Sequence, residues 1–164
     1  MPPAITVRVM PQAVGPGAAL RELRVLPAQR VWVGMIADAL ADLACCPDSD
    51  SMAIWRDDIL VGHYRIDPHG RSIAGHDFPL PTLGLRAFFI DARWQGQGLG
   101  TAALRAMFPD LVARYPAARQ LALSVSTGNQ VAMHLYLRAG FVDGGERYHG
   151  GRSGAQQLLL RPLP

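Results

Sequence analysis

The chain has 164 residues, of which 49% are hydrophobic and 18% charged, and its formal net charge is +3 at pH 7. At ~150 residues per domain this length predicts one domain over residues 1–164, and the composition excludes a disordered chain. All sixteen basic residues are arginines, scattered singly, which argues against a nucleic-acid partner. No apolar run reaches the ~18 residues of a membrane span and no secretory signal opens the sequence, so we expect a cytoplasmic protein with no membrane partner.

Apolar periodicity and turn residues predict five elements in the first half of the chain. Residues 5–10 alternate and carry β-branched side chains, which favours a strand, and apolar residues at helical spacing predict helices after it. The adjacent Asp57 and Asp58 predict the turn of a hairpin, because short polar side chains favour turns. In chain order these elements are a strand, two helices and two strands, at residues 5–10, 18–25, 29–44, 51–55 and 59–66.

The second half alternates strands and helices. Residues 67–81, rich in proline and glycine, predict a loop. Pro109 predicts a kink or a break in the helix around it, because proline lacks a backbone N–H and clashes one turn back. The elements are a strand, a helix, a strand, a helix and two strands, at residues 82–90, 99–115, 120–124, 130–139, 141–149 and 156–161. This order predicts a mixed α/β fold.

Cysteine and histidine usage predicts neither a disulfide nor a metal site. Cys45 and Cys46 are adjacent, where disulfide geometry is strained, and no second cysteine pair completes a zinc pattern. The five histidines form no HExxH motif and no i, i+4 pair. We therefore expect two reduced thiols and no bound metal.

A glycine-rich loop between a strand and a helix carries the chemistry. Residues 95–100 read Gln-Gly-Gln-Gly-Leu-Gly and stand between the predicted strand 82–90 and the predicted helix 99–115. The first N–H groups of a helix have no partner inside it, and the helix dipole adds positive potential there, so this arrangement predicts an anion site. Glycine permits a positive φ and a close approach of the backbone to a phosphate.

The common nucleotide motifs do not fit this loop. A Walker loop ends in Gly-Lys followed by Ser or Thr, and the chain contains no lysine. A dinucleotide fingerprint needs G-x-G-x-x-G, whereas the third glycine here, Gly100, comes one position early. The acidic residue expected about twenty positions later is also missing, because Arg119 and Gln120 stand there.

A second motif follows about thirty residues later, and together the two resemble the GNAT N-acetyltransferase superfamily. The acetyl-CoA loop of that family, [RQ]-x-x-G-x-[GA], is matched by Gln95, Gly98 and Gly100. Its later motif, N-x-x-A-x-x-x-Y-x-x-x-G-F, is matched by Asn129, Ala132, Tyr136, Gly140 and Phe141. The separation of the motifs and the order of elements are similar too, over nearly the whole chain.

The resemblance implies an α/β fold with a mixed, mostly antiparallel sheet of about seven strands. The sheet would splay between the fourth and fifth strands, 82–90 and 120–124, and helices would flank it. Acetyl-CoA would lie in the gap, with its pyrophosphate on the amides of residues 95–100 and its pantetheine arm along residues 88–90. The implied cofactor-binding residues are Phe88, Phe89, Ile90, Gln95, Gly96, Gln97, Gly98, Leu99, Gly100, Thr101, Asn129 and Tyr136.

The implied function is transfer of the acetyl group of acetyl-CoA to a primary amine of a small molecule or peptide. A backbone N–H near Phe88 would stabilise the oxyanion, and Tyr136 would act as the acid toward the departing sulfur. Two alternatives remain open: a non-catalytic acyl-CoA-binding module with the same fold, and a nucleotide-dependent enzyme that uses the glycine loop. We expect a monomer or a homodimer.

The general base and the acceptor are less defined. The strand 82–90 carries no carboxylate, so the candidates are Asp91 and the more distant residues His63, His76, Asp77 and Glu146, and none is assigned. The acceptor site is expected between residues 32–36, 67–81 and 148–154, with polyamines as one option. Arg152 in the last of these segments favours an acceptor that carries an acidic group.

Overall fold

A computed structural model describes residues 4–9, 48–148 and 155–163 of the chain. The helices predicted at 18–25 and 29–44, together with Cys45 and Cys46, lie outside the described residues. So do two of the segments expected around the acceptor, 32–36 and most of 148–154.

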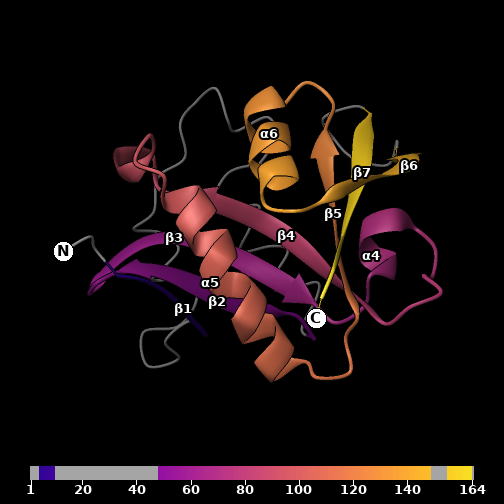
Figure 1. The fold of residues 1–164 in the computed structure, drawn as a ribbon, viewed down its shortest axis with the longest axis horizontal. Coiled ribbons are helices and arrows are strands. Elements are labelled where there is room, and N and C mark those ends of the chain that lie inside the picture. Colours follow the sequence, from indigo (N-terminus) through magenta and orange to yellow (C-terminus); the bar gives the residue numbers. More distant parts are fainter. Residues whose placement is uncertain (1–3, 10–47, 149–154, 164) are drawn as a thin grey trace.

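The described chain is organised around one sheet of seven strands in the order β1-β2-β3-β4-β5-β7-β6 (Figure 1). Only the central β4–β5 pair is parallel, and every other neighbouring pair is antiparallel. The predicted α/β class and the mixed, mostly antiparallel sheet are therefore confirmed. The strands are β1 Ile5–Val9, β2 Asp50–Arg56, β3 Ile59–Asp67, β4 Thr82–Ile90, β5 Gln120–Ser126, β6 Val142–Tyr148 and β7 Gln156–Pro162.

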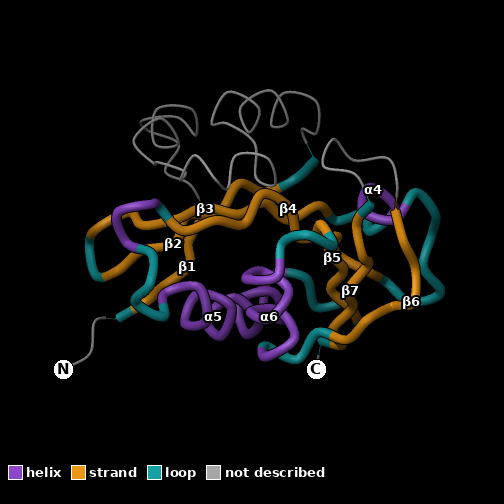
Figure 2. The backbone as a smooth tube through the Cα atoms, turned by 90° about the horizontal axis from the view of Figure 1, so that it is seen from above, coloured by secondary structure: helices purple, strands orange, loops and turns teal. Residues whose placement is uncertain are grey.

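Two long helices cover one face of the sheet, and a short one lies on the other (Figure 2). Helices α5 (Leu99–Arg114) and α6 (Gln130–Arg138) share a face, and the buried side chains of α5 join the main hydrophobic cluster there. The short helix α4 (Arg71–Ala74) packs its Ile73 on the opposite face, against β5 and β7. No helix in the described part of the chain is long and apolar enough to cross a membrane.

Two local predictions are wrong. The segment 67–81 is not only a loop, because its residues 71–74 form α4, which Gly75 ends in a left-handed conformation with φ 80°. Of the kink or break predicted at Pro109, the break does not occur, since α5 runs continuously through this residue. Pro109 and Arg105, whose carbonyl loses its partner, are both exposed, so water can satisfy that carbonyl.

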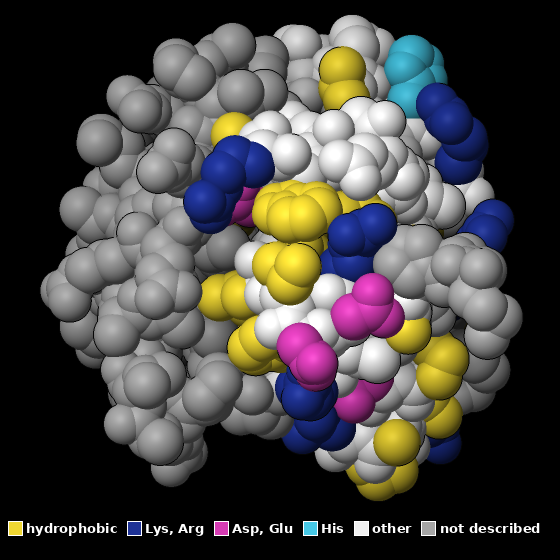
Figure 3. Space-filling model, turned by 90° about the vertical axis from the view of Figure 1, so that its left-hand side faces the viewer, with side chains coloured by type: hydrophobic (Ala, Val, Ile, Leu, Met, Phe, Trp, Pro, Cys, Tyr) yellow, Lys and Arg dark blue, Asp and Glu magenta, His cyan; other side chains and the backbone are white. Residues whose placement is uncertain are grey.

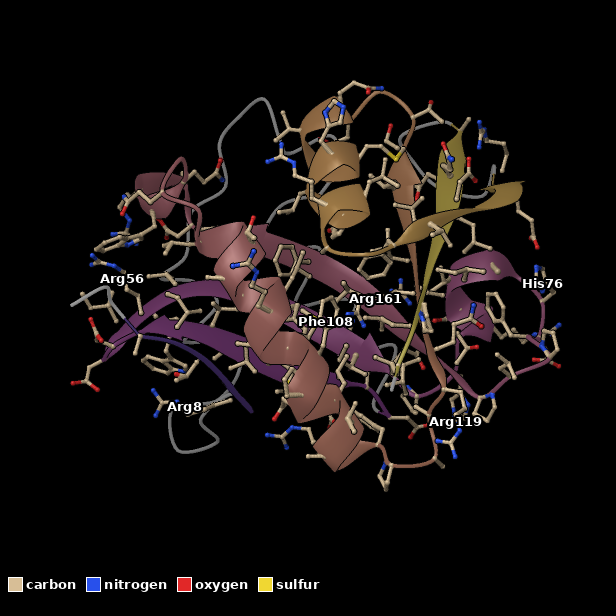
Figure 4. All side chains as sticks on the ribbon, in the orientation of Figure 1. Arg8, Arg56, His76, Phe108, Arg119 and Arg161 are labelled. Carbon is tan, nitrogen blue, oxygen red and sulfur yellow. The ribbon has the colours of Figure 1, made fainter. Side chains whose placement is uncertain are left out.

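Arg161 joins the last strand to both long helices (Figure 4). Its guanidinium lies 3.6 Å from the centre of the Phe108 ring on α5, and its Nε donates to the carbonyl of Ala139 at the end of α6, at 2.9 Å. The cation–π contact and the hydrogen bond fix β7 against the helical face on which the site is built.

Candidate functional site

The sheet opens between β4 and β5. These strands pair only through their first three residues, Thr82–Gly84 with Gln120–Ala122, so the last six residues of β4 run on without β5 beside them. The predicted splay between the fourth and fifth strands is confirmed. It leaves backbone groups of β4 turned toward a gap instead of a neighbouring strand, which suits an extended ligand that adds itself like a strand.

A β-bulge interrupts β4 beside this gap. Arg65 pairs with Arg86 and His63 with Phe89, so a single residue of β3 lies opposite two residues of β4, Ala87 and Phe88. Ala87 has a φ of 53°, which alanine rarely adopts, so the surrounding structure must hold the bulge. Phe88 pairs with neither neighbouring strand.

The structure brings together the two residues predicted to be catalytic. The Tyr136 ring on α6 meets the Phe88 ring edge-on, with 6.2 Å between ring centres, so the bulge of β4 and helix α6 are in contact. Tyr136 also packs edge-on against Phe141, at 5.6 Å. Burial raises the pKa of Tyr136 above its ordinary value, which keeps the phenol protonated and able to donate.

Phe89 does not join this pair. Its ring lies 6.0 Å from that of His63, whereas Phe88 contacts Tyr64 and Tyr136 in the main core. Successive residues of a strand point to opposite faces of the sheet, which places the two neighbouring phenylalanines against different partners. Ile90 belongs to the core cluster as well, so neither Phe89 nor Ile90 offers more than backbone to the gap.

The glycine loop forms an open cradle at the start of α5. Gly96 and Gly98 have φ values of 77° and 75°, and a Cβ built on either meets no atom within 4 Å. Gly98 is the N-cap of α5 and provides no side-chain cap. The first helical hydrogen bond runs from the N–H of Ala102 to the carbonyl of Gly98, so the N–H groups of residues 99–101 can serve an external acceptor. This arrangement fits the predicted pyrophosphate.

Three other residues of the loop, Gln95, Leu99 and Gly100, have structural contacts. The amide of the Gln95 side chain donates to the carbonyl of Ile90 at 2.9 Å, which ties the loop back to the end of β4. Leu99 is buried in the core. A Cβ on Gly100 would lie 3.4 Å from Leu135, so this glycine serves the close packing of α5 on α6. Gln97 is exposed and Thr101 half-buried.

Asp91 and Asn129 stabilise two backbone segments of the site, the turn after β4 and the start of α6. The buried carboxylate of Asp91 accepts from the backbone N–H and the guanidinium of Arg93, at 2.8 to 2.9 Å, so it anchors the turn after β4. The side chain of Asn129 accepts from the N–H of Ala132 at 3.2 Å and caps α6. Asn129 thereby holds the helix that carries Tyr136.

The candidate bases divide into a buried residue and an exposed cluster. Burial, reinforced by Arg65, lowers the pKa of His63 to about 3, so its imidazole is neutral at physiological pH. His76 is exposed, and its Nε2 lies 2.7 Å from a carboxylate oxygen of Glu146 on β6. Asp77 forms an exposed ion pair with Arg71. Figure 4 places His76 at the rim of the molecule, beyond α4.

Replacement of Glu146 by Gln should lower the pKa of His76. That pKa stands above its ordinary 6.5, first because Nδ1 donates to the carbonyl of Asp77 at 2.9 Å and second because Glu146 accepts from Nε2. A raised histidine pKa stabilises the fold below about pH 6.5, and this stabilisation is lost as the pH rises through the folded pKa. Histidine titration by NMR should show the change.

Asp77→Asn is the matched control, because it leaves the backbone carbonyl of Asp77 in place and should move the pKa of His76 much less. Equal titration of His76 in the wild type and in Glu146→Gln would contradict the contribution of Glu146.

Two further observations concern one face of the surface and the described titratable groups. Figure 3 shows the side of the molecule with the β2–β3 turn: arginines lie singly among acidic and hydrophobic side chains, without a continuous basic stripe among those drawn in colour. Among the described residues, no three His, Cys, Asp or Glu side chains lie together so as to hold a metal ion.

Two features of this site cannot be predicted from the sequence. The bulge at Ala87 has no local signal, because alanine is not a residue that marks a positive φ. The position of His63 beside that bulge depends on the register of β3 against β4, which the local sequence does not encode.

Comparison with known proteins finds acetyltransferases in each case. A family model described as "Acetyltransferase (GNAT) family" matches residues 14–141. The spermine/spermidine N(1)-acetyltransferase of Bacillus subtilis (strain 168) is 31% identical over 148 residues, which cover 89% of this chain and 91% of that protein. A probable spermine N(1)-acetyltransferase of Bacillus subtilis subsp. natto (strain BEST195) is 30% identical over the same shares of both chains.

Solved structures share the fold. The aminoglycoside acetyltransferase AAC(6')-Ib with paromomycin and acetyl-CoA superposes with a TM-score of 0.72 at 18% identity, covering 97% of this chain and 93% of that one. Spermidine N-acetyltransferase from Vibrio cholerae, solved with CoA and spermine, gives a TM-score of 0.68 at 14% identity, covering 97% of this chain and 95% of that one.

Proposed function

The chain belongs to the acetyltransferase (GNAT) family, and from this premise we propose a mechanism in which Phe88 and Tyr136 act on the two ends of an acetyl thioester. The protein is an acetyl-CoA-dependent N-acetyltransferase, and acetyl-CoA is its acetyl donor. The observation that carries the proposal is the bulged residue Phe88, which pairs with neither neighbouring strand where the β4–β5 gap opens and whose ring contacts that of Tyr136. The glycine loop 95–100 follows the same strand after one short 3-10 helix, Ala92–Trp94.

The donor would be held at two places along the gap. The N–H groups at the start of α5 would bind its pyrophosphate, because Gly96 and Gly98 leave the space in front of them open. The backbone of residues 88–90 would pair with the pantetheine arm. The Ile90 carbonyl already accepts from Gln95, so this pairing depends on the remaining backbone groups of the segment.

The acetyl transfer is a direct displacement. The acceptor arrives as an ammonium with a pKa of about 10 and releases a proton to water. The amine nitrogen then bonds to the thioester carbonyl carbon, whose oxygen takes the electron pair and accepts from the N–H of Phe88. The bonded nitrogen releases its second proton to water. When the oxygen reforms its double bond, the C–S bond breaks, and the sulfur takes a proton from the Tyr136 hydroxyl. Water reprotonates Tyr136, so the products are an acetamide, CoA and one proton.

No side chain is assigned as the general base. The two candidates with shifted pKa values are unsuited, because His63 is too weak a base at a pKa of about 3 and His76 is engaged by Glu146 at the rim. A chain of water molecules is the proposed route by which the ammonium proton leaves.

The acceptor in this proposal is a primary amine of a small molecule or a peptide, and the relatives favour a small molecule. The two Bacillus subtilis relatives are named for spermine and spermidine, and AAC(6')-Ib is solved with an aminoglycoside. The expectation that Arg152 favours an acidic acceptor concerns a residue outside the described part of the chain. A peptide amine remains within the proposal.

An amine panel with thiol detection tests the proposal. Acetyl-CoA should bind in calorimetry while NAD and ATP do not, and CoA should be released in the presence of at least one amine among spermidine, spermine, aminoglycosides, acidic amino compounds and peptides. Acetyl-CoA binding without thiol release across the panel would instead support a non-catalytic acyl-CoA-binding module. Binding of NAD or ATP in preference would overturn the assignment of the glycine loop.

A further inference from the structure

His63 lies beside the bulge on the strand that borders the gap. It pairs with Phe89, directly after the two bulged residues Ala87 and Phe88, and it is completely buried. Its Nε2 lies 2.9 Å from the hydroxyl oxygen of Ser51 on β2. The other ring nitrogen, Nδ1, is buried without a full hydrogen bond to the described residues, although the ring interacts with the backbone of Ala87.

The protonation of this imidazole follows from its surroundings. Burial and the neighbouring charge of Arg65 keep it neutral, so only one of its nitrogens carries a hydrogen. If the Ser51 hydroxyl donates to Nε2, the hydrogen must be on Nδ1. That nitrogen then points a donor at the Ala87 peptide group, which the positive φ of Ala87 has turned out of the regular ladder.

The Ala87 carbonyl and the Phe88 N–H belong to the same peptide group. In a trans peptide these two groups point in opposite directions, and no cis peptide bond occurs in the described chain. A donor that holds the carbonyl on the β3 side therefore aims the N–H at the opposite side, toward the gap. A hydrogen bond to the carbonyl also polarises the peptide and strengthens its N–H as a donor.

We propose that His63 is a positioning residue for acetyl transfer: its Nδ1–H, fixed by Ser51, holds the Ala87 carbonyl and thereby aims the Phe88 N–H at the thioester oxygen. The inference rests on the proposed function for the role of Phe88. Hydrogen bonds of this kind are often long in the free enzyme and tighten in the reacting complex, which agrees with an Nδ1 that is close to the bulge but incompletely bonded.

Three variants separate this role from simple packing. The amide nitrogen of Asn can occupy the place of Nδ1, so His63→Asn retains the donor, whereas His63→Leu fills the space without one. Because the loss of one positioned donor costs about 10²-fold to 10³-fold in kcat, His63→Leu should lose at least about tenfold through misalignment. His63→Asn should recover most of that loss. Ser51→Ala should have a kcat between those of the wild type and His63→Leu, because without the Ser51 hydroxyl the imidazole hydrogen can be on either nitrogen.

The affinity for acetyl-CoA should stay within about twofold of the wild type in all three variants, because the pyrophosphate cradle is untouched. NMR of ¹⁵N-labelled histidine should show the Nδ1–H tautomer in the wild type. The Phe88 amide resonance should shift in His63→Leu and return in His63→Asn. Both NMR measurements use the free protein, so they decide the inference even if no amine in the panel is acetylated and the proposed function fails.

Several results would overturn the inference: an Nε2–H tautomer in the wild type, equal kcat in His63→Leu and the wild type, or loss of activity in His63→Asn as complete as in His63→Leu. The last result would point to proton transfer or packing by the ring itself. If His63→Leu does not fold, Ser51→Ala and His63→Asn still carry the comparison.

Discussion

Gly98→Val is expected to abolish acetyl-CoA binding while the protein still folds. Gly98 is the N-cap of α5, and a Cβ built on it meets no atom within 4 Å, so the valine side chain would stand in the open space in front of the first helical N–H groups. A phosphate would then be excluded from the helix start. The positive φ of 75° adds strain of about 1 to 2 kcal/mol, which a domain with a stability of about 5 to 15 kcal/mol tolerates. Calorimetry with acetyl-CoA and thermal unfolding measure the two effects.

The chain offers a matched control for this variant. Gly145 on β6 has a φ of 79°, and a Cβ on it also meets nothing within 4 Å, but β6 forms the opposite edge of the sheet from β1, with two strands between it and β4. Gly145→Val therefore introduces a similar backbone strain without blocking the helix start, and it should bind acetyl-CoA normally. Undiminished affinity in folded Gly98→Val would remove the cradle from the site.

Tyr136→Phe should retain acetyl-CoA affinity and slow acetyl transfer by about 10²-fold or more, the usual loss for one positioned acid. The ring contacts with Phe88 and Phe141 survive the change, so the gap keeps its shape. Because burial holds the pKa of Tyr136 above its ordinary value, the wild-type phenol stays protonated, and the ratio of the two rates should be constant across neutral pH. Single-turnover kinetics report the chemical step directly.

Tyr64→Phe provides the comparison for that rate. The Tyr64 ring contacts Phe88 from β3, with 6.3 Å between ring centres, and its buried hydroxyl has no hydrogen-bond partner among the described residues. Loss of this hydroxyl should leave the transfer rate close to that of the wild type. Equal rates in Tyr136→Phe and the wild type, with chemistry limiting, would assign the acid elsewhere.

The sequence predicts the fold wherever local pattern and tertiary structure agree. Two short, largely apolar segments joined by the Asp57–Asp58 turn specify a hairpin locally, and the structure has that hairpin. The two motifs likewise locate the glycine loop and the helix of Tyr136, because each motif lies within one short segment.

The features that the sequence does not predict depend on contacts between distant segments. The bulge at Ala87, the Gln95 side chain on the Ile90 carbonyl, and the place of His63 beside β4 all require the register of strands or the path of a loop. The helix at residues 71–74 has only four residues, and its packing through Ile73 on the sheet stabilises it more than its own propensity does.

The position of β7 between β5 and β6 means that β6 can join the sheet only after β7 has formed. Among the described strands, β6 is bonded to the sheet only through β7, although β6 is synthesised first. Residues 156–162 must first pair with β5, which closes a connection of about thirty residues. Only then can β6 pair with the other side of β7. Loss of those seven residues would remove two strands from the sheet and turn β5 into an open edge, the kind of surface on which chains aggregate.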